Sequence, residues 1–394
     1  MPIKLAPKVY WVGAIDWDVR EFHGYLTEKG STYNAFLILD DKITLIDTVK
    51  KEFLPEMLER ISKIVAPEQI DYIVSNHVEM DHSGGLPQAM ARLQPEKLFC
   101  SPLGKAGLSR HYQADWPFVE VKTGQELSLG QHHLLFLETP MLHWPDSMMT
   151  LLKEEQILFS SDGFGAHFAS SERFDDQTPD MAAYLHQVKK YYANILMPFG
   201  GLITKLFQRI QALNLEFKLI APDHGLLLRN PAPILSAYQQ WAAGKVLPKA
   251  LVIYDTMWHS TEFLARALTE GLIDAGADTI LYRLRHTHYS DIVPDLLDAG
   301  LLLFGSPTLN NNMFPSVGEF LVYLQGLKPQ NKAAAAFGSY GWSGQAVSLI
   351  NQVLEVLKFR MVHEGLSVKY RPTPQELAEA RALARRLAEE NLKL

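Results

Sequence analysis

Cysteine, which forms disulfides and thiolate metal sites, occurs only once among the 394 residues, as Cys100. One cysteine excludes an intramolecular disulfide framework, thiolate zinc sites and cysteine-ligated iron–sulfur clusters within one chain. Apolar runs of the roughly 18 residues that span a bilayer are also missing. Asp16 and Asp18 follow closely on the first residues. We therefore expect a cytoplasmic protein without a signal peptide or a membrane span.

A block of basic residues is missing as well. The chain has 37 Lys and Arg against 44 Asp and Glu, a formal net charge of −7, which argues against binding to nucleic acid or an anionic membrane surface. Neither G-x-x-x-x-G-K-[ST] nor a G-x-G-x-x-G after a strand occurs, so nucleotide hydrolysis and dinucleotide binding have no support. Histidine, by contrast, occurs 14 times, which directs attention to metal sites built from nitrogen and oxygen ligands.

The length of the chain predicts two or three domains of about 100–200 residues each. Two regions with different sequence patterns follow one another along it. In residues 1–247, short strands alternate with helices, which is typical of a layered α/β domain. Apolar, β-branched and aromatic content predicts these strands at 32–39, 43–47, 72–75, 133–138 and 157–160. Apolar residues that recur every three or four positions predict helices at 53–64 and 178–195. A proline-containing connector is expected at 228–249.

Residues 248–394 show a regular βαβ rhythm. The predicted strands are continuous apolar runs, and they lie at 250–254, 279–284, 301–305 and 333–338. Helices between and after them include 261–275 and 374–394. Buried strands with crossover helices predict a doubly wound parallel sheet.

A cluster of candidate metal ligands follows the strand predicted at 72–75. His77, Glu79, Asp81 and His82 occupy four of six consecutive positions. Without a cation, the two carboxylates would repel each other and the lone pairs of the cluster would lack partners. A bound metal resolves both problems, and the alternative is a polar surface loop.

Three further candidates, His143, Asp162 and His224, lie at later strand ends or turns. Each one alone is more often a turn residue, because Asp before Gly after a strand is a turn signal and His before Gly suits a helix end. Together with the first cluster they favour a metal site.

Three loops of the second region leave the carboxyl ends of its predicted parallel strands, where sheets of this kind bind ligands. Their residues are Thr256, Met257, Trp258, His259, Ser260 and Thr261, then Ser306, Pro307, Thr308, Leu309, Asn310 and Asn311, then Gly338, Ser339, Tyr340, Gly341, Trp342, Ser343 and Gly344. The first loop offers hydroxyl and N–H groups at a helix start, which suits a phosphate, although such a start is also typical of a simple helix cap. The last loop offers glycines and aromatic rings that stack on a planar group.

These motifs resemble known families. The pattern H-x-[EH]-x-D-H, followed by His, Asp and His, resembles the metallo-β-lactamase superfamily, most members of which have histidine in the second place and bind zinc. Glu79 in that place, with loops that look like those of flavodoxin, resembles the A-type flavodiiron proteins over essentially the whole chain. The resemblance implies an N-terminal metallo-β-lactamase-like αββα sandwich over residues 1–247. It implies a C-terminal flavodoxin-like doubly wound parallel sheet over residues 248–394.

The resemblance also implies two iron ions and FMN as cofactors. One iron would be held by His77, Glu79 and His143, and the other would be faced by Asp81, His82 and His224, with Asp162 bridging them. In some members of the family, water displaces the residue that matches His82. Four imidazoles and three carboxylates suit a redox-active iron pair. Asp223 and Asn76 are candidates for orienting ligands, and the FMN would lie in the three loops of the second domain.

Near the irons, His23 and Tyr192 or its neighbour Tyr191 are candidate hydrogen-bond donors to a bound diatomic molecule, and Trp144 is a candidate pocket wall. For each of them, packing in the core is an equal alternative.

The resemblance implies an oxygen or nitric oxide reductase. Electrons would pass from an external donor, such as rubredoxin or a reduced deazaflavin, through FMN to the iron pair, which reduces O2 to water, NO to N2O, or both. The sequence has no C-x-x-C pair, so we expect no fused rubredoxin domain. A head-to-tail homodimer or a dimer of dimers would bring one subunit's FMN to the other's irons.

Two alternatives remain open at this point. One is a zinc hydrolase of the metallo-β-lactamase superfamily with a fused flavodoxin module, which Glu79 argues against. The other is an electron carrier whose metal domain is a relic, which seven intact ligand positions argue against.

Overall fold

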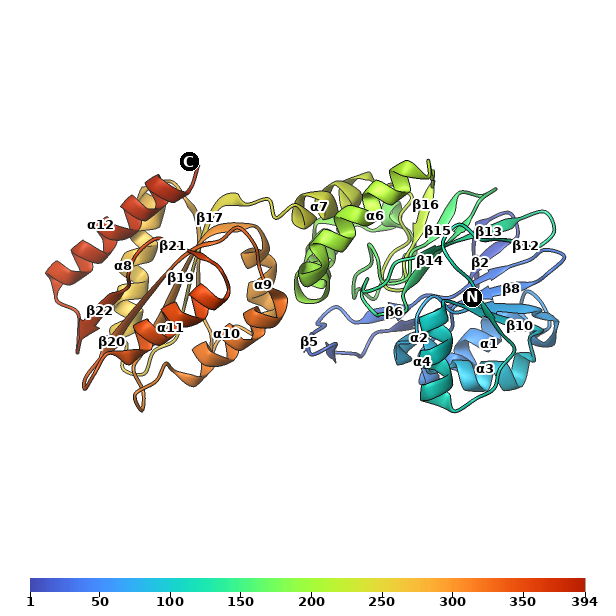
Figure 1. Ribbon diagram of the computed structural model, residues 1–394, viewed down its shortest axis with the longest axis horizontal. Helices are drawn as coiled ribbons and strands as arrows, with labels where there is room; N and C mark the ends of the chain where they lie inside the picture. Colours follow the sequence, from blue (N-terminus) through green and yellow to red (C-terminus); the bar gives the residue numbers. More distant parts are fainter. Residues whose placement is uncertain (394) are drawn as a thin grey trace. The chain divides into compact units, whose positions relative to one another are not determined.

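The computed structural model describes residues 1–393, which form two compact units (Figure 1). The first unit comprises Met1–Tyr191 and Gly201–Gln239. The second comprises Tyr192–Gly200 and the chain from Gln240 onward. The contacts therefore divide the chain slightly before the boundary expected near residue 247, and they assign one short internal segment to the second unit.

That internal segment interrupts a helix that the sequence predicts to run without a break over 178–195. The regular helix α5 (Met181–Tyr191) passes into a π-helical turn (Tyr192–Leu196) and then a 3-10 turn (Met197–Phe199). The helix α6 (Gly200–Ala212) follows directly. Apolar periodicity shows that such a stretch is helical, but it does not show where the helix changes pitch.

The first unit is built on two sheets. The larger has the strand order β1 (Ile3–Ala6), β2 (Val9–Trp11), β7 (Phe36–Ile38), β8 (Thr44–Ile46), β9 (Tyr72–Val74), β10 (Lys97–Cys100) and β11 (Phe118–Glu120). The smaller has the order β12 (Glu126–Ser128), β13 (His133–Glu138), β14 (Met148–Leu152), β15 (Ile157–Phe159) and β16 (Leu219–Ala221). Two short pairs stand apart from them, β3 (Ala14–Asp16) with β6 (Ser31–Tyr33), and β4 (Glu21–Phe22) with β5 (Tyr25–Leu26).

The two sheets pack face to face. Trp11 and Phe36 from the larger sheet share one apolar core with Phe136 and Phe159 from the smaller. The other face of the larger sheet is covered by the helices α1 (Leu54–Ser62), α3 (Leu86–Leu93) and α4 (Pro102–Tyr112). The helices α6 and α7 (Ala232–Ala242) lie over the outer face of the smaller sheet in Figure 1. The expected αββα sandwich is therefore confirmed.

The second unit is a parallel sheet. Its strands follow the order β18 (Asp278–Arg283), β17 (Leu247–Tyr254), β19 (Ala299–Pro307), β20 (Ala333–Tyr340) and β21 (Arg360–Met361), with β22 (Leu366–Lys369) also paired to β20. Taken in chain order, this is the 2-1-3-4-5 arrangement of flavodoxin-like folds, as expected. The short final strands β21 and β22 were not predicted.

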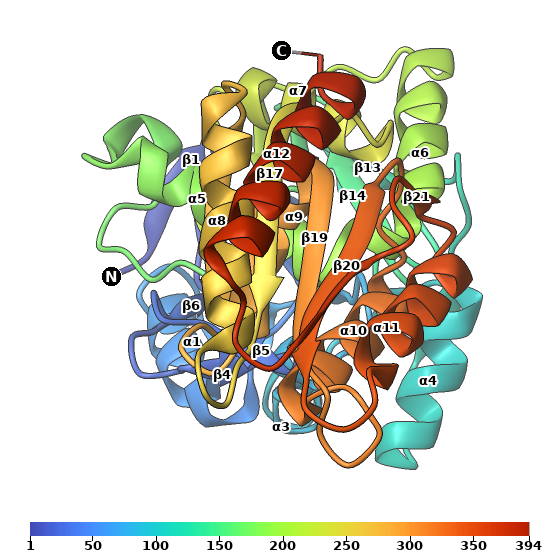
Figure 2. The same cartoon turned by 90° about the vertical axis from the view of Figure 1, so that its left-hand side faces the viewer.

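Helices cover both faces of this sheet, as Figure 2 shows. One layer consists of α8 (Ser260–Asp274) and α12 (Pro374–Asn391), and the other consists of α9 (Tyr289–Asp298), α10 (Pro315–Leu327) and α11 (Gln345–Val356). Alternate residues of the central strands, such as Val252 and Leu303, share a core with the first layer. Among residues 1–393, no helix combines the length and the hydrophobicity that a bilayer crossing needs.

Packing between α8 and α12 depends on Gly271. A Cβ atom at this position would lie 2.1 Å from the carbonyl oxygen of Arg381 and 3.0 Å from Cβ of Ala384. Because the first neighbour is backbone, α12 would have to shift to admit even one methyl group.

We therefore expect Gly271→Ala to destabilise the second unit by about 1–3 kcal/mol, although alanine is the better helix former. The matched control is Gly326→Ala in α10, where a Cβ atom meets no atom within 4 Å. That variant should gain up to about 1 kcal/mol from helix propensity. Calorimetry of both variants tests the prediction, and equal transition temperatures would contradict it.

Candidate metal centre and flavin pocket

The predicted metal ligands lie on loops at one edge of the sandwich. β15 runs parallel to β16 and antiparallel to β14, so the loop before β14 reaches the same edge as the loops after β15 and β16. The loop after β9 joins this edge because the amide of Met148 donates to the carbonyl oxygen of Asn76 at 2.9 Å. The ligands are His77 and Glu79 on the loop after β9, Asp81 and His82 in the one-turn helix α2 (Met80–Ser83) that follows it, His143 before β14, Asp162 after β15, and His224 after β16.

These seven side chains converge in three sets, two of which share Glu79. Asp81, His82 and His224 form one set, with one ligand atom from each residue within 4.8 Å of the others. His77, Glu79 and Asp162 form another, and His143 joins Glu79 in a third set that also includes His23. The sequence-based grouping of Asp81, His82 and His224 around one ion matches the first of these sets.

Asp162 lies between the sets. Its Oδ2 atom is 3.5 Å from Nε2 of His77 and 3.3 Å from Nε2 of His143. Its Oδ1 atom is 3.5 Å from Nε2 of His224. One carboxylate oxygen therefore faces each group of ligands, which is the arrangement that a bridging carboxylate requires.

The facing atoms are close together without bonding one another. Nε2 of His224 lies 3.0 Å from Oδ2 of Asp81, and Nε2 of His143 lies 3.2 Å from Oε2 of Glu79. Two ligands that each lie about 2.1 Å from one ion are separated by about 3.0–3.4 Å. Within residues 1–393, the buried atoms without a hydrogen-bond partner include Nε2 of His77, His82, His143 and His224 and both carboxylate oxygens of Asp81 and Asp162. The donor set therefore fits a pair of metal ions.

Backbone carbonyls fix which ring nitrogen is free to bind a metal. Nδ1 of His82 lies 3.0 Å from the carbonyl oxygen of Thr48, and Nδ1 of His224 lies 2.6 Å from that of Thr32. A carbonyl only accepts, so Nδ1 carries the hydrogen and Nε2 presents its lone pair to the cluster. This outer partner is typical of histidines that bind metals.

The buried carboxylates make the cluster attract positive charge. Burial alone would lower the pKa of His77 and His224, but the neighbouring carboxylates outweigh it and raise these pKa values to about 10 and about 9. Burial, reinforced by the carboxylate of Asp47, raises the pKa of Asp223 well above its usual value. Metal dications relieve the same repulsion without adding protons to the ligands.

Asp223 and Asn76, the candidates for orienting the ligands, both lie next to the cluster. Oδ2 of Asp223 is 3.4 Å from Nδ1 of His77. The side-chain amide of Asn76 donates to Oδ2 of Asp47 at 2.6 Å, and its oxygen accepts from the hydroxyl of Thr150 at 2.8 Å. Asp47 was not predicted, although it directly follows the buried strand β8.

Of the three residues predicted to surround the substrate, two contact a ligand directly. Nε2 of His23 is 2.8 Å from Oε1 of Glu79, and the indole N–H of Trp144 donates to Oε2 of Glu79 at 2.6 Å. The choice of Tyr192 needs correction, because its ring packs on Trp241 at 5.0 Å within the second unit.

Tyr191 is the tyrosine that the structure brings to the ligands. Its ring lies 6.2 Å from that of His224 and 5.2 Å from that of His167. Successive helical residues point about 100° apart, so only one of the two adjacent tyrosines faces this cluster. His167 is a buried histidine that the sequence analysis missed.

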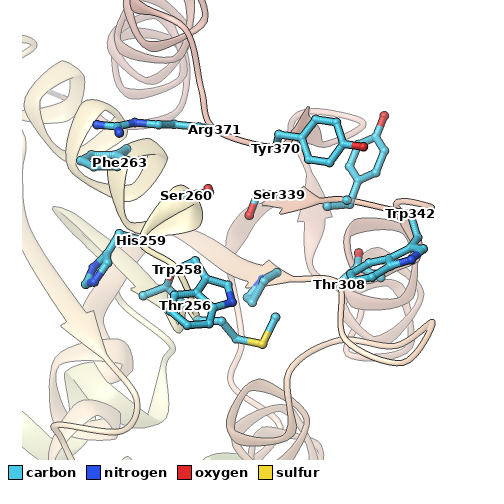
Figure 3. Close-up of a pocket in the computed structure, with 14 residues that line it drawn as sticks. Thr256, Trp258, His259, Ser260, Phe263, Thr308, Ser339, Trp342, Tyr370 and Arg371 are labelled. Atoms are coloured by element: carbon cyan, nitrogen blue, oxygen red, sulfur yellow. The ribbon is translucent and has the colours of Figure 1, made fainter.

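A cavity of about 790 Å³ opens at the carboxyl end of the parallel sheet (Figure 3). Eleven of the residues predicted to bind the flavin line it: Thr256, Met257, Trp258, His259, Ser260, Pro307, Thr308, Ser339, Tyr340, Gly341 and Trp342. Three lining residues were not predicted: Phe263, Tyr370 and Arg371. Tyr370 and Arg371 follow β22, the short strand that the sequence analysis overlooked.

The other predicted flavin residues do not line this cavity. The hydroxyl of Thr261 bonds that of Ser339 at 2.8 Å, and Ser306 accepts from the amide of Phe314 at 2.8 Å, so both support the loops from behind. Leu309 and Asn310 line a separate groove beside α10. The remaining residues, which are not among the lining residues of the main cavity, are Asn311, Gly338, Ser343 and Gly344.

The cavity suits a flat aromatic ligand that carries an anion. Trp258, Trp342 and Tyr370 are 85%, 90% and 65% exposed, so large ring faces are available for stacking. The hydroxyl oxygen of Thr256 is buried without a hydrogen-bond partner among the described residues. Ser260 begins the 15-residue helix α8, whose N-terminus favours a phosphate. These residues fit FMN.

One buried carboxylate ties the flavin loops together. Asp255, fully buried, accepts from Nε of Arg285 at 2.9 Å, from the hydroxyl of Ser316 at 2.5 Å and from the amide of Thr256 at 2.8 Å. These partners come from the loop of Asp255 itself, from the loop after β18 and from the first turn of α10. Asp255 therefore holds the first flavin loop in register with its neighbours.

The first unit is an αββα domain with converging histidines and carboxylates, and the second is a flavodoxin-like domain with an aromatic pocket. Together they define an oxidoreductase that uses a metal pair and a flavin. The comparisons with known proteins agree. Residues 32–225 match the model of the ODP family beta lactamase, and residues 252–383 match that of Flavodoxin.

Relatives and solved structures match nearly the whole chain. The chain is 43% identical to a nitric oxide reductase of Moorella thermoacetica, covering 98% of each protein. It is 41% identical to the rubredoxin-oxygen oxidoreductase of Megalodesulfovibrio gigas, covering 98% of this chain and 97% of the relative. The flavodiiron protein from Giardia intestinalis superposes with a TM-score of 0.95 at 34% identity, covering 99% of this chain and 96% of that one. The chain belongs to the flavodiiron protein family.

If Asp162 bridges two ions, replacing it removes a negative charge shared by two dications. We expect Asp162→Ala to bind one metal ion or none, with unchanged FMN content, since the flavin loops belong to the other unit. Metal analysis of the purified protein measures this. The control is Asp175→Ala, a buried carboxylate that accepts from the backbone amide of Arg229 at 2.8 Å. Two ions retained in Asp162→Ala would show that Asp162 is a turn residue.

Proposed function

We propose that this protein passes electrons from an external donor through FMN to a di-iron site and reduces O2 to water, NO to N2O, or both. The observation that carries the proposal is the ligand set itself, in which Glu79 stands among four imidazoles and two aspartates with their lone pairs converging. When bound, the iron pair supplies Lewis acidity and reducing equivalents, and FMN supplies electrons one or two at a time.

The chain's own residues have distinct tasks in this proposal. His77, Glu79 and His143 would hold one iron, Asp81, His82 and His224 would hold the other, and the carboxylate of Asp162 would be shared by both. Thr32 and Thr48 keep the ligand rings in the tautomer that presents Nε2.

His23 and Trp144 form the wall of the substrate pocket. Both place N–H groups on the two oxygens of Glu79, which holds that carboxylate in place. Rings in this place would exclude water from one side of the ligands, and a drier site strengthens the local electrostatic interactions.

The zinc hydrolase is the weaker alternative. Glu79 replaces an imidazole by an anionic oxygen, which favours the harder redox metal over zinc. The relatives named above are reductases.

The donor is proposed to be a separate molecule. One relative is named for rubredoxin, and another, 40% identical, is named a coenzyme F420H(2) oxidase. The donor for this chain is therefore a small reduced redox protein or a reduced deazaflavin. We place the reaction in the cytoplasm.

Steady-state assays with the iron- and FMN-loaded protein test the proposal. With one chemical or protein donor, consumption of O2 and of NO is compared for the natural protein and for Glu79→His. We expect the natural protein to reduce at least one gas and Glu79→His to shift toward zinc and lose the activity. Full turnover with retained iron in Glu79→His would exclude Glu79 as a ligand that selects the metal, and a zinc-loaded natural protein with hydrolase activity would favour the alternative.

We also propose a head-to-tail homodimer, or a dimer of such dimers, in which the flavin of one subunit serves the irons of the other. The metal ligands and the flavin pocket belong to different compact units, and electron transfer requires that the two cofactors come close together.

Subunit mixing tests this assembly. Asp162→Ala is inactive at the metal, and Ser260→Tyr combined with Gly341→Trp blocks the flavin pocket. Each preparation alone should be inactive, and random reassembly into two-fold dimers should restore about one quarter of the natural activity. Mixed dimers that form and stay inactive would show that electrons pass within one chain.

A further inference from the structure

His23 sits at a backbone position that histidine occupies at a cost. It joins β4 to β5 with Gly24, and the φ angles of the two residues are 54° and 75°. Two positive φ values in a two-residue hairpin loop define a type I′ turn, for which asparagine followed by glycine is preferred. A bulky ring in this place indicates that the side chain has a task.

Both ring nitrogens of His23 have partners. Nε2 lies 2.8 Å from Oε1 of Glu79, and Nδ1 lies 3.3 Å from Nε2 of His167. The His23 side chain is only 10% exposed. The ring is therefore held between a candidate ligand and a second histidine.

His167 is itself enclosed by the hairpin that carries His23. Its side chain is buried, and its ring packs against Phe22 at 4.9 Å and Tyr25 at 5.7 Å, the residues on either side of the turn. Its Nδ1 atom lies 2.8 Å from the hydroxyl oxygen of Ser31, on β6. Among residues 1–393, His167 is absent from every set of converging metal ligands.

The four side chains Ser31, His167, His23 and Glu79 form a series of hydrogen bonds. The positions of its hydrogens follow from the groups at its two ends. Oε1 of Glu79 faces Nε2 of His23 at 2.8 Å, and a carboxylate that binds a metal is ionised. An ionised carboxylate only accepts, so Nε2 of His23 carries a hydrogen. With Nε2–H directed at Glu79, Nδ1 of His23 is the acceptor, and the donor is Nε2 of His167.

The Ser31 end of this hydrogen-bond series agrees with donation from His167 to His23. Nε2 of His167 faces the accepting Nδ1 of His23 at 3.3 Å, so the hydrogen of the His167 ring lies on Nε2. With that hydrogen on Nε2, Nδ1 accepts from the hydroxyl of Ser31. Ser31 also lies 3.4 Å from Nδ1 of His224, which donates instead to the closer carbonyl of Thr32 at 2.6 Å.

We propose that His167 is a positioning residue for the reductase site: it donates to His23 so that His23 presents Nε2–H to Glu79, and Ser31 sets the tautomer of His167. This inference rests on the proposed function, because Glu79 matters through the metal it binds. The chain Ser31, His167, His23, Glu79 then acts as one unit, with each donor pointing toward Glu79.

Three variants at the two histidines test the inference. His167→Leu removes the donor, and His167→Gln keeps an amide N–H near the place of Nε2. His23→Asn suits the type I′ turn, so the hairpin still folds, but it removes the ring. The control is His186→Leu on α5, where the histidine is exposed.

The measurements are iron and FMN content, the Mössbauer spectrum of the iron-loaded protein, and kcat and KM. His167→Leu should keep both irons and its KM, change the spectrum, and lose about 10–100-fold in kcat, the usual effect of removing an outer partner. His167→Gln should regain most of the activity. In the His23→Asn background, His167→Leu should cause no further loss, because it acts through His23.

Three results would overturn the inference. Natural kcat and spectrum in His167→Leu would show that the chain of donors has no effect. Iron loss in both His167→Leu and His167→Gln would reduce His167 to a packing residue. Additive losses in the double variant would separate the two histidines. If the natural protein reduced neither gas, the proposed function would fail, while the spectra would still report whether His167 acts on Glu79.

Discussion

The first unit is organised around a buried cluster of carboxylates and imidazoles whose ligand atoms face one another. Glu79, Asp81 and Asp162 converge with four imidazoles, and most of their ligand atoms have no hydrogen-bond partner among the described residues. Isolated buried carboxylates cost several kcal/mol each, so bound cations, or protons on the neighbouring imidazoles, stabilise this arrangement. Strand directions, carbonyl acceptors and the hairpin that carries His23 all serve to bring these groups together.

The flavin pocket occupies a similar place in its own sheet, but it is built from side chains of a different kind. It also lies where parallel strands end, but its largest side chains are exposed rings instead of buried charges. Its one fully buried carboxylate, Asp255, is satisfied by Arg285, Ser316 and Thr256. The metal site thus depends on positive charge for electrostatic balance, whereas the flavin loops are held in shape by protein contacts.

Local patterns in the sequence predicted most of the fold and the seven candidate ligands, because each ligand lies on a segment that follows or precedes a recognisable strand. Contacts between distant segments were harder to predict. His167 meets His23 across a separation of 144 residues, and no spacing in the sequence indicates that. Tyr370 and Arg371 were missed because β22 has only four residues and an exposed pattern. The choice between Tyr191 and Tyr192 depends on where α5 becomes a π-helical turn, which periodicity does not reveal.

Backbone strain occurs in the loops that carry both sites, as well as at helix ends and in other turns. Non-glycine residues with positive φ include His23, Asp47, Met141, Ser161 and Phe164 beside the metal ligands, and His259, Asn310, Asn311 and Tyr370 at the flavin end. Each such residue costs on the order of 1 kcal/mol, while the interiors of the sheets are continuous buried strands. The sheets thus supply the stability that lets the loops hold side chains in unfavourable conformations. His23 shows the principle most directly, since asparagine would suit its turn better but would not reach from Glu79 to His167.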